Sequence, residues 1–181
     1  MWMTFAMKSK FPDHLEPTLF EVMDQFRLDL TGPHGVPHWN RVFFHGEAIA
    51  DHTEGVDREI VNLFAVLHDS QREDDDSDLG HGPRAALYTR KLWSQGMLVL
   101  PKDRLLVLEK AIKNHSFGYV EKHNRTIAAC WDSDRLDLGR TGTYPATGLL
   151  SCDYARREDV IEQAWFGSRP TGKRLAMIEG V

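Results

Sequence analysis

The stretch "LFAVLHDSQRE", residues 63–73, begins like a buried helix and then places two ionisable side chains, His68 and Asp69, at its end. An unpartnered carboxylate costs several kcal/mol when it is buried, so buried charges in proteins are paired or bound to metal. The apolar run therefore predicts a central helix of the fold. It also predicts that His68 and Asp69 meet partners inside the protein.

Helical periodicity recurs on both sides of this stretch, with apolar residues at steps of three and four, and no strand pattern persists. Two glycines and two prolines interrupt the pattern at 31–37, and a polar loop follows Asp69. The sequence predicts an all-α domain spanning residues 1–181, a compact helical bundle whose glycine-containing C-terminal tail is loosely held. The expected helices cover residues 15–30, 38–52, 57–69, a segment starting near Pro83, 103–115, 125–136 and 154–165.

Composition and charge argue against several classes of protein. The chain has 181 residues, 41% of them hydrophobic, which suits one globular domain with a substantial core. A formal charge of −5 offers no basic surface, so no nucleic-acid polymer is expected as a partner. No apolar run approaches the ~20 residues of a membrane span, and Cys130 and Cys152 are expected to be free thiols. We therefore expect a cytoplasmic protein without a membrane partner, and the sequence leaves a homodimer open.

The helical stripes also carry ionisable residues. By spacing, His68, His81, His115 and Asp134 each fall on the apolar side of a predicted helix, and His38 opens another helix beside Trp39. A single inward histidine is usually a hydrogen-bonded core residue, and a lone Asp134 could cap a helix or pair with arginine. Several such residues pointing into one small domain instead favour a metal site in a helical bundle. Nitrogen and oxygen ligands suit Mn, Fe, Mg, Co or Zn.

These residues form an ordered pattern. "HWNRV" (38–42), "LHD" (67–69) and "DSDRLD" (132–137) supply a histidine, a His-Asp pair and a distant aspartate, and "HGPRAA" (81–86) and "AIKNHS" (111–116) lie between them. In this order the chain resembles the HD-domain superfamily of metal-dependent phosphohydrolases over about residues 35–140. The resemblance implies an all-α fold of the HD-domain type, with the N-terminal and C-terminal helices packed on that core. It also implies one or two divalent ions in the bundle core, with four ligands: His38, His68, Asp69 and Asp134.

The resemblance implies hydrolysis of a phosphoester in a nucleotide or another small molecule, with Asp69 both binding metal and orienting water. Arg72 follows one turn later, where its guanidinium suits phosphate, although it could equally pair with the acidic run 73–78. His81 and His115 are expected to line the metal cavity, where they contact substrate phosphate or hold a second ion. His115 is also a candidate general acid.

Other branches of the superfamily provide alternatives. No Gly-Tyr-Pro element follows the His-Asp pair, which argues against a cyclic-di-GMP phosphodiesterase of that type. Glu73-Asp74 is offset by one residue from the pattern of the alarmone hydrolases, which disfavours that activity. A two-iron oxygenase and a catalytically silent metal- or nucleotide-binding module stay open, although the intact ligand set argues against loss of the metal.

Overall fold

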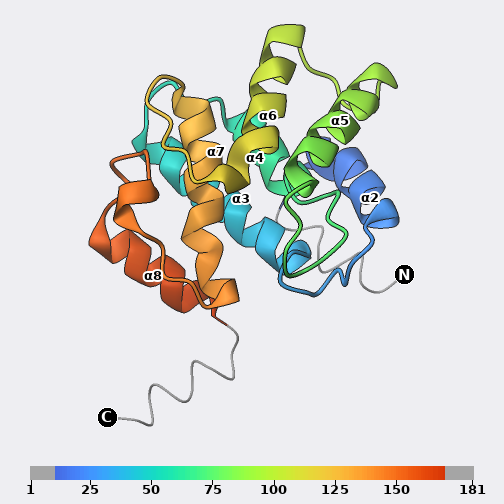
Figure 1. The fold of residues 1–181 in the computed structure, drawn as a ribbon. Helices are drawn as coiled ribbons and strands as arrows, with labels where there is room; N and C mark the ends of the chain where they lie inside the picture. Colours follow the sequence, from blue (N-terminus) through green and yellow to red (C-terminus); the bar gives the residue numbers. More distant parts are fainter. Residues whose placement is uncertain (1–10, 170–181) are drawn as a thin grey trace.

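The computed structural model describes residues 11–169, and this part of the chain is helical, without a strand (Figure 1). The expectation of an all-α fold is thus confirmed for the described residues. The segments 1–10 and 170–181, including the tail expected to be loosely held, lie outside them. The helices are α2 (Glu16–Gln25), α3 (Val36–His52), α4 (Arg58–Leu67), α5 (His81–Ser94), α6 (Lys102–Asn114), α7 (Arg125–Leu136) and α8 (Glu158–Ser168). Short 3-10 turns lie at Asp13–Leu15, His115–Phe117, Asp137–Thr141 and Thr147–Leu149.

Helix α4 forms the centre of the core. The Asp57 side chain caps its start by accepting from the Ile60 main-chain N–H at 3.3 Å, and every residue from 60 to 67 is buried. A helix that is buried on all sides needs neighbours on all sides. Helices α2, α3, α6 and α7 supply them. The apolar run of the opening stretch is therefore the central helix, and the residues that follow it, His68 and Asp69, lie in the middle of the molecule.

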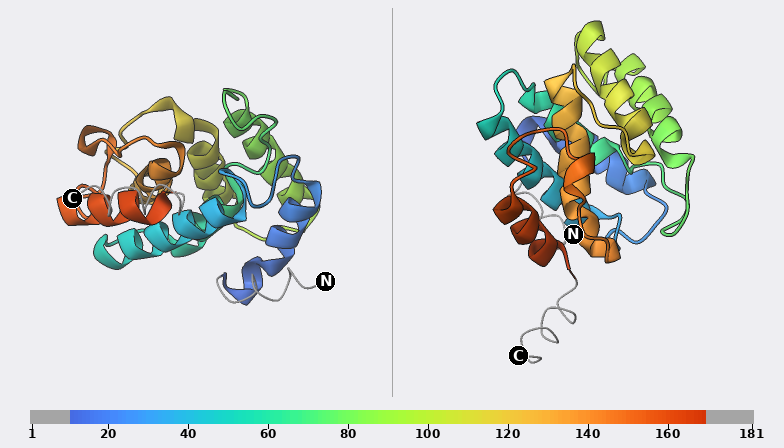
Figure 2. Two further views of the ribbon diagram at one scale, coloured as in Figure 1. Left: turned by 90° about the horizontal axis from the view of Figure 1, so that it is seen from below. Right: turned by 60° about the vertical axis from the view of Figure 1, so that its left-hand side comes forward.

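The remaining helices lie at opposite ends of this centre. Helix α5 packs against α6 at one end, while α8 packs against the turn Asp137–Thr141 at the other (Figures 1 and 2). In the described part of the chain, no helix combines the length and apolar character needed to cross a membrane.

The helix predicted for 15–30 was too long, since α2 ends at Gln25 and Phe26 is extended (φ −65°, ψ 129°). The Phe26 ring then packs edge-on against Trp39, with 5.1 Å between ring centroids. The main-chain oxygen of Leu30 accepts the N–H of Val36 at 2.8 Å. These contacts compensate for ending the helix early, and periodicity alone did not reveal them.

Other helix boundaries also differ from the prediction. Helix α4 ends at Leu67 rather than 69, so His68 and Asp69 follow it instead of lying within it. Helix α5 starts at His81 rather than near Pro83, which is its third residue. The last helix starts at 158 rather than 154 and continues to Ser168. Tyr154 lies in a turn before that helix, where its ring stacks on His52 at a centroid distance of 4.0 Å.

Candidate metal centre

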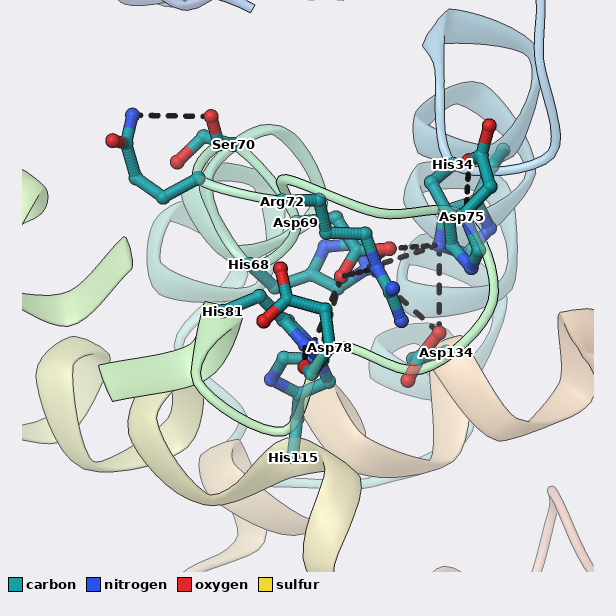
Figure 3. A network of polar contacts seen from close by, with 12 residues as sticks. His34, His68, Asp69, Ser70, Arg72, Asp75, Asp78, His81, His115 and Asp134 are labelled. Carbon is teal, nitrogen blue, oxygen red and sulfur yellow. Dashed lines mark hydrogen bonds and ion pairs between the residues drawn. The ribbon is translucent and has the colours of Figure 1, made fainter. Parts of the chain in front are cut away.

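Six buried side chains meet where the ends of α4, α6 and α7 approach the starts of α3 and α5 (Figure 3). His38 lies in the first turn of α3, and Asp134 in the last turn of α7. His68 follows α4 directly, His81 begins α5, and His115 follows α6. Asp69 lies next to His68 and is also buried. All the ligand residues singled out in the sequence, and both additional histidines, thus lie in one cluster.

One half of the cluster consists of His38, His68, Asp134 and one oxygen of Asp69. His38 Nε2 lies 3.0 Å from His68 Nε2, 3.6 Å from Asp69 Oδ2 and 3.5 Å from Asp134 Oδ1. His68 Nε2 lies 3.6 Å and 3.7 Å from the same two oxygens. Adjacent ligands of an ion bound at about 2.0–2.3 Å lie about 3.0–3.7 Å apart. The spacing therefore fits one ion held by His38, His68 and Asp134, and Asp69 Oδ2 lies 3.6 Å from both of these histidines.

The other half uses the second oxygen of Asp69. Asp69 Oδ1 lies 3.3 Å from His81 Nε2 and 3.5 Å from His115 Nε2, and those two nitrogens are 2.8 Å apart. The two oxygens of Asp69 thus face separate pairs of histidines. This arrangement can bridge two ions, or one ion and a proton shared by His81 and His115.

All four imidazoles are oriented by hydrogen bonds from Nδ1. Because the acceptors are carbonyl or carboxylate oxygens, each Nδ1 must carry the hydrogen, and in the neutral ring Nε2 keeps a lone pair. The lone pairs then face one another across the cluster, which is unfavourable unless a cation or proton lies between them. The acceptors are Asp137 Oδ2 for His38 (2.6 Å), Phe64 O for His68 (3.0 Å), Asp78 O for His81 and Ile112 O for His115 (2.7 Å).

The electrostatics favour neutral imidazoles and ionised carboxylates. Burial is the largest influence on the pKa values of His38 and His68 and lowers both; burial also lowers the pKa of His81, to about 4. For Asp69 and Asp134 burial acts to raise the pKa, but neighbouring nitrogen groups, His68 foremost, hold both below their usual range. Neutral nitrogens and charged oxygens are the forms that bind metal.

His115 behaves differently. Burial again acts to lower its pKa, but the contact with Asp69 and the charge of Asp134 outweigh burial, so its pKa lies above the ordinary value. A proton on His115 Nε2 would satisfy both His81 Nε2 and Asp69 Oδ1. His115 is therefore the histidine of this cluster best suited to carry a proton.

Asp137 is a functional candidate that sequence reasoning missed. It is buried and accepts from Arg41 Nε at 2.5 Å, in addition to its contact with His38 Nδ1. The signal was present in "DSDRLDLGR", where Asp134, Asp137 and Arg140 recur at steps of three. That spacing places successive side chains on one helical face.

Asp137→Asn should weaken metal binding about 10- to 100-fold, because partners that orient a ligating histidine typically contribute that much to metal affinity. Titration of the purified variant with Mn²⁺ measures the effect. The exposed Asp159→Asn is the matched control and should bind Mn²⁺ as the unaltered chain does. Equal affinity in Asp137→Asn would contradict this role for Asp137.

The polar segment 70–80 runs across the front of the cluster (Figure 3). Arg72 donates from Nε to Asp69 Oδ1 at 3.2 Å and from Nη1 to the main-chain oxygen of Asp74 at 2.9 Å. Its carboxylate partner is therefore Asp69 rather than an acidic side chain of the loop. The loop is held by contacts of Asp75 with the buried His34, at 2.8 Å, and of Asp78 with Arg84.

Gly82 determines how closely α5 approaches α6 beside the cluster. A Cβ atom at Gly82 would lie 2.9 Å from the main-chain oxygen of Lys113 and 3.0 Å from that of Ile112, which also accepts from His115. Main-chain atoms cannot rotate away as a flexible side chain can, so a methyl group would push α5 and α6 apart.

Gly82→Ala should therefore destabilise the fold by about 1–3 kcal/mol, the usual cost of an overpacked contact. Urea unfolding measures this change. Gly167→Ala is the control, because Gly167 lies exposed in α8 with no neighbour within 4 Å, and alanine should be neutral or stabilising there. Equal stability of the two variants would show that the α5–α6 contact is not tight.

The residues present fit a metal ion, because Asp134 Oδ1 is a buried oxygen without a hydrogen-bond partner in the described structure. Two groups of buried side chains are close enough to hold ions: His38 with His68 and Asp134, and His68 with Asp69 and His115. No protein-family model matches the chain, and comparisons with curated proteins and with solved structures give no match either. The chemistry of the site itself therefore indicates the function.

Proposed function

We propose that the protein is a metal-dependent phosphohydrolase that cleaves a phosphoester of a nucleotide or another small molecule. The observation that carries the proposal is the pair of Nε2 atoms of His38 and His68, 3.0 Å apart with both Nδ1 atoms engaged. Two lone pairs at that distance call for a cation between them, and the oxygens of Asp69 and Asp134 lie at the spacing of further ligands. The likeness to the HD-domain pattern agrees with this chemistry.

His38, His68, Asp69 and Asp134 would hold the ion, and His81, His115 and Asp69 would hold a second one if two bind. Bound there, such an ion would supply charge to neutralise phosphate oxygens and would lower the pKa of water enough to provide the nucleophile near neutral pH. Mn, Fe, Mg, Co and Zn all suit the nitrogen and oxygen donors.

The chain's own residues supply orientation and proton transfer. Asp69 is buried between the two histidine pairs, so its carboxylate can accept a hydrogen bond from the attacking water and fix its direction. A protonated His115 Nε2 can donate to the leaving oxygen, and its Nδ1 contact with Ile112 keeps the ring in place. Arg72 is positioned beside Asp69 to contact a phosphate oxygen.

A two-iron oxygenase is the second candidate, since one observation favours it: the separate oxygens of Asp69 face two pairs of histidines. A bridging carboxylate between two ions would serve oxidation as well as hydrolysis. The identity and number of the ions, together with the reaction supported, separate the two candidates.

The test combines metal analysis with activity. The protein is loaded in turn with Mn²⁺, Fe²⁺, Mg²⁺, Co²⁺ and Zn²⁺ and assayed with nucleoside mono-, di- and triphosphates and small phosphoesters. Release of phosphate that depends on metal and is lost in His68→Gln supports the proposal, while the exposed His123→Gln serves as control. Two irons with oxygen consumption and no phosphate release would favour the oxygenase. Bound nucleotide without turnover would indicate a silent binding module.

A further inference from the structure

Arg140 places a second guanidinium beside the cluster. The turn Asp137–Thr141 directs its side chain inward, and only 7% of that side chain is exposed. Its Nη2 lies 3.6 Å from Asp134 Oδ1, and its Nη1 donates to the main-chain oxygen of Asp137 at 3.1 Å. Arg140 therefore lies beside Asp134 without a hydrogen bond to it, whereas Arg72 donates to Asp69.

The Arg140 guanidinium is incompletely satisfied. Its Nε is buried and has no hydrogen-bond partner within the described structure, and the Nη2 contact with Asp134 is too long for a hydrogen bond. A buried N–H group of a charged side chain is costly to leave unpaired. An anion at the metal centre would supply the missing acceptor.

The charges at the centre do not balance without an anion. One divalent ion cancels the two carboxylates of Asp69 and Asp134, so the guanidiniums of Arg72 and Arg140 remain as excess positive charge. Two other nearby carboxylates are already paired with arginine, Asp137 with Arg41 and Asp78 with Arg84. Asp75 contacts His34, whose pKa is lowered by burial, and keeps its charge, but 41% of its side chain is exposed, so water screens that charge.

We propose that Arg140, together with Arg72, selects a phosphate group that carries two negative charges. The substrates would be phosphomonoesters or chains ending in a terminal phosphate, and phosphodiesters, with one charge, would be excluded. The inference rests on the proposed function, since it assumes a divalent ion bound at this site. It adds a specificity residue, Arg140, and a charge requirement for the substrate.

Ligand binding to the Mn²⁺-loaded protein tests the charge requirement without a catalytic assay. At pH 8 methyl phosphate is doubly charged, because the second pKa of a phosphate monoester is about 6. Methyl sulfate has nearly the same shape with one charge, and dimethyl phosphate is the diester probe. Calorimetric titration should give methyl phosphate and inorganic phosphate an affinity about 10-fold or more above both singly charged probes, because the second negative charge adds Coulomb attraction to the ion and to both guanidiniums. Equal binding of methyl phosphate and methyl sulfate would overturn the proposal.

Variants of Arg140 test its role in binding methyl phosphate. Arg140→Gln should lower the affinity for methyl phosphate about 10- to 100-fold, the effect of losing hydrogen bonds to a charged group, and should retain Mn²⁺. Arg140→Lys keeps the charge without the planar fork, so its affinity for methyl phosphate should lie between those of the unaltered chain and Arg140→Gln. The exposed Arg157→Gln is the control and should bind as the unaltered chain does.

The outcomes distinguish failure of the charge selection by Arg140 from failure of the metal centre. Unchanged binding of methyl phosphate in a folded Arg140→Gln variant would overturn the role of Arg140 and leave the metal centre standing. A chain that binds Mn²⁺ and shows no preference for double charge would overturn the specificity alone. A chain that binds none of the divalent ions would overturn both proposals. If Arg140→Gln does not fold, the comparison of probes on the unaltered chain still decides the charge requirement.

Discussion

Asp69→Asn should reduce metal-dependent phosphate release about 1000-fold or more, since losing about 4 kcal/mol of transition-state stabilisation has that effect. The oxygens of the Asp69 carboxylate face both histidine pairs, at 3.6 Å from His38 and His68 and at 3.3 Å and 3.5 Å from His81 and His115. An amide keeps the size of the side chain but removes the charge, and its NH₂ group would face either nitrogen lone pairs or the ion.

The variant also separates a metal role from a structural one. Without metal, the Asp69→Asn variant should be less stable than the unaltered chain, because the substitution removes the carboxylate that pairs with Arg72, so activity and metal content are compared on samples shown to be folded. Metal content by elemental analysis and phosphate release are measured on the same sample, with the exposed Asp51→Asn as control. A fully active Asp69→Asn chain would show that Asp69 neither binds the catalytic ion nor orients the water.

The positions of His68, His115 and Asp134 on the apolar faces of their helices predicted that these side chains meet in the core. His68, His115 and Asp134 lie on stripes whose apolar members are buried, so the same packing that covers those stripes brings the polar residues together. Periodicity predicted the central helix α4 and the four helices that pack against it, which are α2, α3, α6 and α7. The apolar run 60–67 was the most informative, because a helix buried on every side leaves the residues at its C-terminal end no route to solvent.

Contacts that depend on turns could not be predicted in the same way. Asp137 and Arg140 lie in the 3-10 turn that follows α7, where residues three apart align, and the sequence did not show that the chain would tighten there. His34 is buried before α3 begins, within a segment whose glycines and prolines indicated only a break. The early end of α2 likewise follows from the contact of Phe26 with Trp39, which are distant in sequence.

Removing the metal should lower the melting temperature. An ion that binds only the folded chain stabilises it by about 4 kcal/mol when its free concentration is about 1000 times the dissociation constant. For a domain of this size that corresponds to a shift of roughly 10 °C. Without the ion, the carboxylates of Asp69 and Asp134 and the Nε2 atoms of four imidazoles face one another in a largely apolar interior, where all of these side chains are buried.

Thermal melts of the metal-loaded chain, before and after chelation confirmed by elemental analysis, measure this shift. His68→Gln is the informative control, because it keeps a polar side chain directly after α4 but removes a ligand shared by both groups of candidate ligands. Its melting temperature should respond little to metal or chelator. If confirmed metal loss leaves the unaltered chain's melting temperature unchanged, the arginines must already balance the carboxylates. The cluster would then be a self-contained ion-pair network, with Arg72 on Asp69 and Arg140 on Asp134, and its histidines would be core residues.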